Sequence, residues 1–136
     1  MNDDYALTAE TPSIEDYLRL RVSAGLSPKA KANATAGLPN TWFAVVVRKN
    51  DQAVGMGRII GDGGLFFQIV DIAVEPAHQG RGLGKAIMTA LMDQLHRDAQ
   101  GAYVSLIADG EANRLYAQYG FEPTAPKSIG MAQVIR

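Results

Sequence analysis

Residues 79–84, with the sequence Gln-Gly-Arg-Gly-Leu-Gly, carry the residue types best suited to binding chemistry in this chain. Glycine lets the backbone approach a ligand without interference from a Cβ atom. The segment follows an apolar run, 65–74, and precedes residues whose apolar positions recur at helical spacing. Because the first turn of a helix presents unpaired N–H groups and the positive end of its dipole, this order indicates an anion site, and phosphate is the usual anion.

The two best-known phosphate loops do not match this segment. A dinucleotide fingerprint, G-x-G-x-x-G, that begins at Gly80 needs a third glycine where the chain has Lys85. A P-loop aligned on Gly84 and Lys85 fails at both ends, because the chain has Gln79 and Ala86 there. The loop therefore indicates a phosphate ligand of another kind.

Two carboxylates lie on or beside the apolar run before the loop. Asp71 stands within residues 68–72, Gln-Ile-Val-Asp-Ile, where a carboxylate is tolerated only if it is hydrogen-bonded or functional. Asp71 is our candidate general base and Glu75 is a second candidate, while a structural hydrogen bond explains Asp71 at least as well. With His78 and His96 as the two histidines and no cysteine, we expect no transition-metal site.

Several secondary elements must position these residues. Apolar spacing and turn residues predict two early helices, one begun by Thr11 and Pro12 and ended by Gly25, the other begun by Ser27 and Pro28 and ended near Gly37. Runs of β-branched and aromatic residues predict strands over 42–49, 52–61, 65–75, 103–107 and 131–135. Between these strands we expect a helix over 83–97 and a short helix that is capped by Asp109 and ends near residue 120. The strands at 65–75 and 103–107 flank a helix, so they should be parallel.

Composition limits the class of protein. The chain has 136 residues, 47% of them apolar, which predicts one globular domain over 1–136. Its net charge is −1, with no basic excess to neutralise a nucleic-acid backbone, so we expect no nucleic-acid partner. The longest apolar run, 42–47, is too short to span a bilayer. We expect a soluble, cytoplasmic protein without a membrane partner.

Two motifs together resemble a known family. Gln79, Gly82 and Gly84 form Q-x-x-G-x-G behind Val-Glu-Pro at 74–76, and residues 115–121 read Leu-Tyr-Ala-Gln-Tyr-Gly-Phe. These segments resemble the acetyl-CoA loop and the later L-Y-x-x-x-G-F segment of the GNAT superfamily of N-acyltransferases, and the order of elements is similar across nearly the whole chain. The resemblance implies an α/β (α+β) fold with a mixed, mostly antiparallel central sheet, flanking helices and a β-bulge or splay at the cofactor site.

The resemblance also implies roles for particular residues. It implies acetyl-CoA as the cosubstrate, no metal, and Tyr116 as the general acid that protonates the departing thiolate. Asn113 is taken in place of an asparagine that the family often has where this chain has Asp109. The cofactor-binding residues that it implies, through backbone groups or side chains, are Ile72, Ala73, Val74, Gln79, Gly80, Arg81, Gly82, Leu83, Gly84, Lys85 and Asn113.

We therefore expect an N-acetyltransferase that acts on a primary amine of a small molecule by direct attack in a ternary complex. Without cysteine there is no thiol to form an acyl-enzyme. The acceptor should bind between residues 17–26, 62–67 and 123–131. Two alternatives stay open at this point, a non-catalytic acyl-CoA-binding or sensing module and a nucleotide-binding regulator. An exposed last strand would also offer a homodimer edge.

Overall fold

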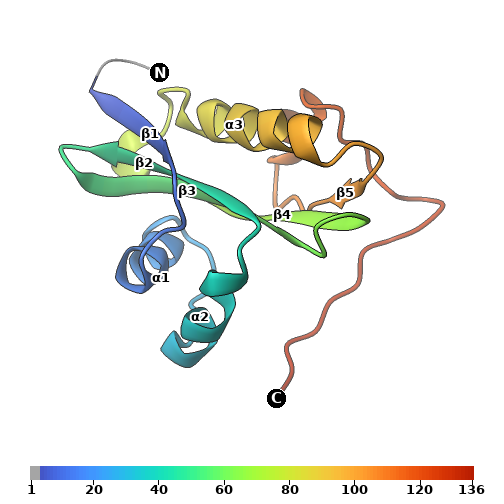
Figure 1. The fold of residues 1–136 in the computed structure, drawn as a ribbon, viewed down its shortest axis with the longest axis horizontal. Coiled ribbons are helices and arrows are strands. Elements are labelled where there is room, and N and C mark those ends of the chain that lie inside the picture. The colour runs from blue at the N-terminus through green and yellow to red at the C-terminus, as the bar shows by residue number, and fades with distance from the viewer. Residues whose placement is uncertain (1–3) are drawn as a thin grey trace. The chain divides into compact units, whose positions relative to one another are not determined.

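The computed structural model describes residues 4–136 and divides the chain into two compact units, the first ending at Leu106 and the second comprising Ile107–Arg136. A five-stranded sheet of order β1-β2-β3-β4-β5 runs through the first unit (Figure 1). Each neighbouring pair is antiparallel except β4 and β5, which are parallel, so the predicted mixed and mostly antiparallel sheet is confirmed. The strands are β1 (Tyr5–Ala9), β2 (Phe43–Lys49), β3 (Gln52–Gly61), β4 (Phe66–Val74) and β5 (Tyr103–Ser105).

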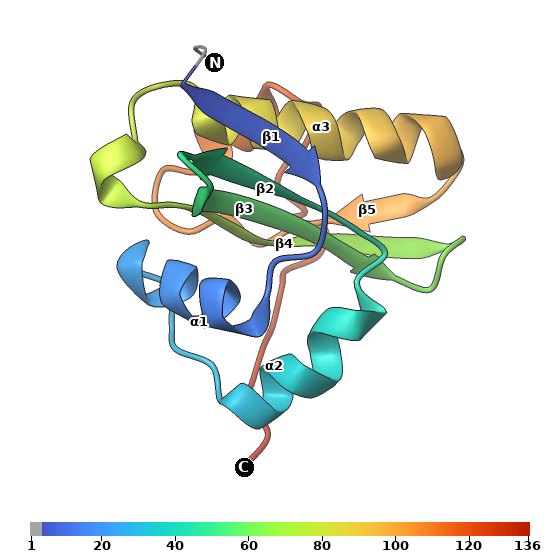
Figure 2. The same cartoon turned by 60° about the vertical axis from the view of Figure 1, so that its left-hand side comes forward.

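Helices cover both faces of this sheet. Helix α3 (Leu83–Asp98) lies on one face, and α1 (Ile14–Ser23) and α2 (Lys31–Gly37) lie on the other (Figures 1 and 2). Two 3₁₀ turns, η1 (Leu38–Asn40) and η2 (Pro76–His78), follow α2 and β4, and the second unit contains α4 (Asn113–Ala117). In the described part of the chain, no helix is long and apolar enough to cross a membrane.

Close packing fixes α3 against the sheet. Leu83, Ile87, Met88 and Leu91 are buried along its inner face, at the spacing that the sequence predicts for one side of a helix. A Cβ atom at Gly57 of β3 would come within 2.5 Å of Ile87 Cγ2, so only glycine lets the helix approach this closely. The glycine loop is therefore held at a fixed place over the end of β4.

The early helices begin later than predicted. Ser13, rather than Thr11, caps α1 by accepting a hydrogen bond from the Asp16 backbone N–H at 3.1 Å. Helix α2 begins at Lys31, since Ala30 still has extended backbone angles and no side chain caps the helix. The predicted start at Ser27 and Pro28 is wrong, and a loop occupies those positions.

Three further differences concern the ends of the chain. Strand β1 was not predicted, because only Tyr5 in its five residues is buried and its alternation is short. Residues 131–135 form no strand, so the predicted last strand is wrong, and Met131, Val134 and Ile135 are 71–87% exposed. Asp109 does not cap α4, which begins at Asn113 without a side-chain cap.

Candidate active site

A β-bulge interrupts β4 near its end. Met56 lies opposite Ala73 and Arg58 lies opposite Val70, so β4 contains one more residue than β3 over this stretch. Asp71 takes up the extra length with a left-handed φ of +58°. A bulge bends its strand and locally disrupts the ladder. The predicted irregularity thus falls at Asp71 and Ile72, directly before Ala73 and Val74.

Beyond the bulge β4 still pairs with β3, but among residues 4–136 its other edge has no paired strand after Gln68. Strand β5 pairs only with Phe66, Phe67 and Gln68, whereas β4 continues to Val74. Within the described residues, no strand pairs with the β5-facing edge of residues 69–74. An open edge of this kind offers backbone N–H and C=O groups to an extended ligand, as it would to an added strand.

The glycine loop joins this edge to the start of α3. Gln79 donates from Nε2 to the carbonyl of Val74 at 3.0 Å, which fastens the loop to the end of β4. Gly80 and Gly82 have φ values of +77° and +81°. A Cβ atom at either glycine would meet nothing within 4 Å, so the space in front of the loop is open.

The N-terminus of α3 is free of competing side chains. Gly82 is its N-cap, no side chain caps it, and its first turn carries no acidic residue. Its leading N–H groups and the positive end of its dipole therefore face the open space. Leu83 is 1% exposed and offers only its backbone, whereas Arg81 is exposed. These features fit a pyrophosphate group, as the sequence predicts.

Asp71 sits in a buried ionic cluster with Tyr17, Arg21 and Arg58, here called the Asp71 cluster. Its Oδ1 accepts hydrogen bonds from Arg21 Nη1 at 2.7 Å and from the Tyr17 hydroxyl at 3.0 Å, and its Oδ2 accepts one from Arg58 Nε at 3.0 Å. The Asp71 side chain is only 6% exposed. Because a cation engages each oxygen, the geometry favours a structural role and not the base that we predicted.

The cluster links three elements around the bulge. Tyr17 and Arg21 come from α1, Arg58 from β3 and Asp71 from β4. Arg21 also donates to the carbonyl and the hydroxyl of Ser27, at 2.8 and 2.9 Å, and so fixes the loop after α1. The second candidate base, Glu75, is ion-paired with Arg19 at 3.1 Å. Arginines thus pair with both predicted bases: Arg21 of α1 and Arg58 of β3 with Asp71, and Arg19 of α1 with Glu75.

Tyr17 gives this cluster a measurable pH dependence. Burial, the negative charge of Asp71 and the hydrogen bond to that carboxylate raise the pKa of Tyr17 to about 12. Between pH 10 and 12 the unfolded chain loses the phenolic proton and the folded chain keeps it, so stability falls as pH rises. We expect the free energy of unfolding of the wild type, relative to that of Tyr17→Phe, to fall by about 2–3 kcal/mol across this window. Urea unfolding at stepped pH measures this difference, and a pH-independent difference contradicts the prediction.

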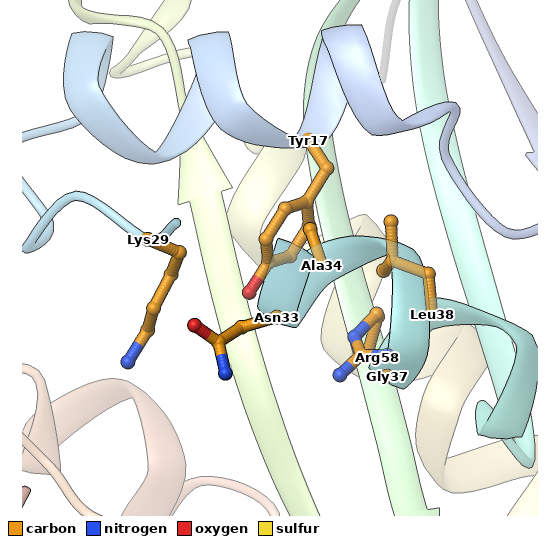
Figure 3. Close-up of a pocket in the computed structure, with 7 residues that line it drawn as sticks. All are labelled: Tyr17, Lys29, Asn33, Ala34, Gly37, Leu38 and Arg58. Atoms are coloured by element: carbon orange, nitrogen blue, oxygen red, sulfur yellow. The ribbon is translucent and has the colours of Figure 1, made fainter. Parts of the chain in front are cut away.

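A pocket of about 100 Å³ opens beside this cluster. Figure 3 shows Tyr17 entering from α1, with Lys29 and Asn33 beside it and Arg58 rising from the sheet. Ala34, Gly37 and Leu38 complete the lining. The sequence predicts an acceptor site near Tyr17 but does not single out Lys29 or Asn33, because an exposed lysine in a loop and an exposed asparagine on a short helix usually only face solvent.

The second unit holds the remaining predicted residues, Tyr116 and Asn113, both on α4. Burial raises the pKa of the Tyr116 phenol, and the nearby carboxylate of Asp109 raises it further. The phenol therefore stays protonated at neutral pH, as a proton donor must. Asn113 is exposed at the first residue of the helix.

Proteins that are similar to this chain in sequence and fold are named as acetyltransferases. Residues 40–123 match the profile of the acetyltransferase (GNAT) domain. An uncharacterised N-acetyltransferase, ycf52, from Porphyra purpurea is 35% identical over 125 residues, which cover 89% of this chain and 71% of that protein. A probable acetyltransferase of unknown function from meticillin-resistant Staphylococcus aureus is 46% identical, with a TM-score of 0.92 over 96% of this chain and 99% of that one.

A soybean (Glycine max) protein named histone acetyltransferase TAP1 is 36% identical over 78 residues, which are 57% of this chain and 33% of that protein. The family match and these relatives place the chain among the acyltransferases. The chain belongs to the GNAT superfamily of N-acetyltransferases, and membership implies the use of acetyl-CoA.

Proposed function

We propose that this enzyme transfers an acetyl group from acetyl-CoA to the primary amine of a small molecule, by direct attack in a ternary complex. One observation carries the proposal: the open edge of β4 after the bulge leads directly to a glycine loop and an uncapped helix N-terminus. A linear ligand with an amide-rich arm and a pyrophosphate needs these two features next to each other. When bound, acetyl-CoA supplies the activated thioester.

The residues of the first unit hold the cofactor in this proposal. Ile72, Ala73 and Val74 offer backbone groups to the arm, while the N–H groups of residues 80–85 face the pyrophosphate. Gln79 holds the loop on β4, as its bond to the Val74 carbonyl supports. The exposed guanidinium of Arg81 and the Lys85 side chain add positive charge beside the phosphates. Asn113 of the second unit is retained as a cofactor contact.

Proton transfer is assigned to one residue and to solvent. Tyr116 is the general acid for the leaving thiolate, and its raised pKa keeps the required proton in place. Asp71 is not retained as the base, since its oxygens are engaged by Arg21 and Arg58. The acceptor amine instead loses its proton through water. Since the chain has no cysteine, we propose direct attack on the thioester.

A matched pair of glycine variants tests the cofactor site. Gly82 and Gly101 have similar φ values of +81° and +86°, and a Cβ atom at either has open space around it. Alanine should therefore cost each about the same backbone strain, roughly 1–2 kcal/mol. We expect Gly82→Ala to weaken acetyl-CoA binding at least about tenfold, while Gly101→Ala binds as the wild type does. Isothermal titration calorimetry provides the comparison, and equal binding by both variants contradicts the proposed site.

Transfer itself separates the enzyme from a binding or sensing module. The assay incubates the protein with acetyl-CoA and a panel of small amines and follows the release of the free thiol. Binding of acetyl-CoA without transfer to any amine, under conditions where a known transferase works, supports the module instead. Thermal stabilisation by ATP or NAD but not by CoA supports a nucleotide-binding regulator and contradicts the whole proposal.

Two further proposals concern the oligomeric state of the enzyme and its location in the cell. The side chains of Ile129, Met131, Val134 and Ile135 are 69–87% exposed, which supports a homodimer in which these residues are covered. Analytical ultracentrifugation of the full chain decides this, and a monomer at micromolar concentration rules the dimer out. We also propose a cytoplasmic location, which fluorescence microscopy of the tagged protein tests.

A further inference from the structure

We propose that the pocket between α1, α2 and β3 binds an anionic group of the acceptor, a carboxylate or a phosphate, and that Lys29 selects for it. This inference rests on the proposed transfer to a small amine and goes beyond it by naming the substrate class. The pocket is lined by Tyr17, Lys29, Asn33, Ala34, Gly37, Leu38 and Arg58. None of these seven side chains is acidic.

The charge around the pocket is positive. Lys29 and Arg58 line it, and Arg21 contributes a third cation through its contact with Asp71. Asp71 is the carboxylate of this cluster and pairs with both Arg21 and Arg58. Three positive charges and one negative charge leave a local net charge of +2. An anion brought into the pocket therefore meets an attractive potential, and a second ammonium group meets a repulsive one.

The cations differ in how freely they can meet a ligand. Arg58 is 8% exposed and is held on two sides, by Asp71 and by the hydroxyl of Thr41. Lys29 is exposed, and among residues 4–136 it forms no ion pair with a carboxylate. In the view of Figure 3 the amide of Asn33 lies between the ammonium of Lys29 and the guanidinium of Arg58. A fixed guanidinium, an amide and an exposed ammonium suit recognition of oxyanions.

The size of the pocket limits what it holds. A volume of about 100 Å³ is well below the ~300–1,000 Å³ of pockets that enclose a whole ligand. It accommodates a carboxylate or phosphate with one or two methylene groups. The bulge that carries Asp71 is followed at once by Ile72 on the open edge of β4. Arg58 both lines the pocket and pairs with Asp71, so the proposal requires a short chain between the anion and the amine.

Matched acceptors test the class. The panel comprises glycine, β-alanine, 4-aminobutyrate and 6-aminohexanoate, each beside its amide, together with phosphoethanolamine beside ethanolamine. We expect at least one anionic acceptor to exceed its neutral partner about tenfold in kcat/KM, as a charge-assisted contact gives. The carboxylate and phosphate pairs show which oxyanion the pocket prefers.

Two lysine variants locate the effect. Lys29→Glu places a carboxylate at the pocket and should abolish or reverse the preference for anionic acceptors, mainly through KM. Lys31→Glu makes the same change in net charge two positions away, at the first residue of α2, outside the pocket lining. This control should keep the preference. Circular dichroism is used to check that both variants are folded.

A binding measurement decides the outcome where turnover does not. Calorimetry compares 4-aminobutyrate and phosphoethanolamine with their neutral partners on the CoA-loaded protein, for the wild type and for Lys29→Glu. Equal kcat/KM for acids and amides, or a preference that survives Lys29→Glu, overturns the inference and leaves the transferase activity in place. If no amine is acetylated, the proposed function fails for these acceptors. Anion binding lost in Lys29→Glu then still supports the pocket, and no anion binding overturns it.

Discussion

Replacing Tyr116 by phenylalanine should lower the turnover number about 10²- to 10⁴-fold, the range expected when a positioned general acid is lost. The variant removes the phenolic proton and changes little else, because the ring and its packing remain. The proton is available in the wild type because burial and the Asp109 carboxylate raise the pKa of Tyr116. Acetyl-CoA binding should stay within about twofold of the wild type, since the proposed phosphate contacts lie elsewhere, at residues 79–85.

Tyr119→Phe is the matched control for this experiment. It is the same substitution three residues further along, just beyond the end of α4, and we expect it to retain wild-type turnover. Steady-state rates give kcat, and calorimetry gives the acetyl-CoA affinity of each variant. A single-turnover measurement shows whether thiol release or product dissociation limits the wild type. If Tyr116→Phe has the same single-turnover rate as the wild type, Tyr116 does not act as the general acid.

The parts of the fold that the sequence predicts well are those in which local pattern and tertiary packing agree. The apolar residues of α3 recur on one face and pack against the sheet, and β3 follows its predicted limits from Gln52 to Gly61. Strand β3 lies between β2 and β4, and α3 packs on these same three strands. Their sequences must therefore satisfy propensity and burial together, which makes the pattern strong.

The errors fall where a neighbour decides the structure. Strand β1 is short and half exposed, so its pairing with β2 shows only weakly in its sequence. Residues 131–135 have strand-forming side chains but no strand forms there. A strand needs a partner edge, and composition alone cannot supply one. The cap at Ser13 rather than Thr11 is a smaller error of the same kind, because both residues suit an N-cap.

The candidate site also contains one part that the sequence predicts and one part that it does not. The backbone conformation of the glycine loop could be predicted, because glycine accepts left-handed angles that other residues avoid, and Gly80 and Gly82 adopt such angles. The role of Asp71 could not, since a carboxylate inside an apolar strand signals either chemistry or buried ion pairing. Its partners Arg21 and Arg58 are distant in sequence, 50 and 13 residues away. Only the fold brings them to one carboxylate.

Asp71→Ala should strongly destabilise the first unit. It leaves the guanidinium groups of Arg21 and Arg58, each in a side chain about 10% exposed, without their shared counter-ion. Removing one partner from a buried ionic cluster costs about 3–5 kcal/mol. Alanine also tolerates the φ of +58° less well than aspartate or asparagine. Urea unfolding at pH 7 measures the loss directly.

Asp71→Asn separates charge from backbone conformation. Asparagine keeps an oxygen acceptor and accepts a left-handed φ, so we expect a smaller loss of stability than with alanine. The same variant also tests the role as a base. If Asp71 is structural, folded Asp71→Asn at low temperature retains kcat within about tenfold; a loss of kcat comparable to that of Tyr116→Phe, with stability unchanged, restores Asp71 as the base. Stability within about 0.5 kcal/mol of the wild type in both variants contradicts the ionic cluster, because two buried cations cannot lose their shared carboxylate without cost.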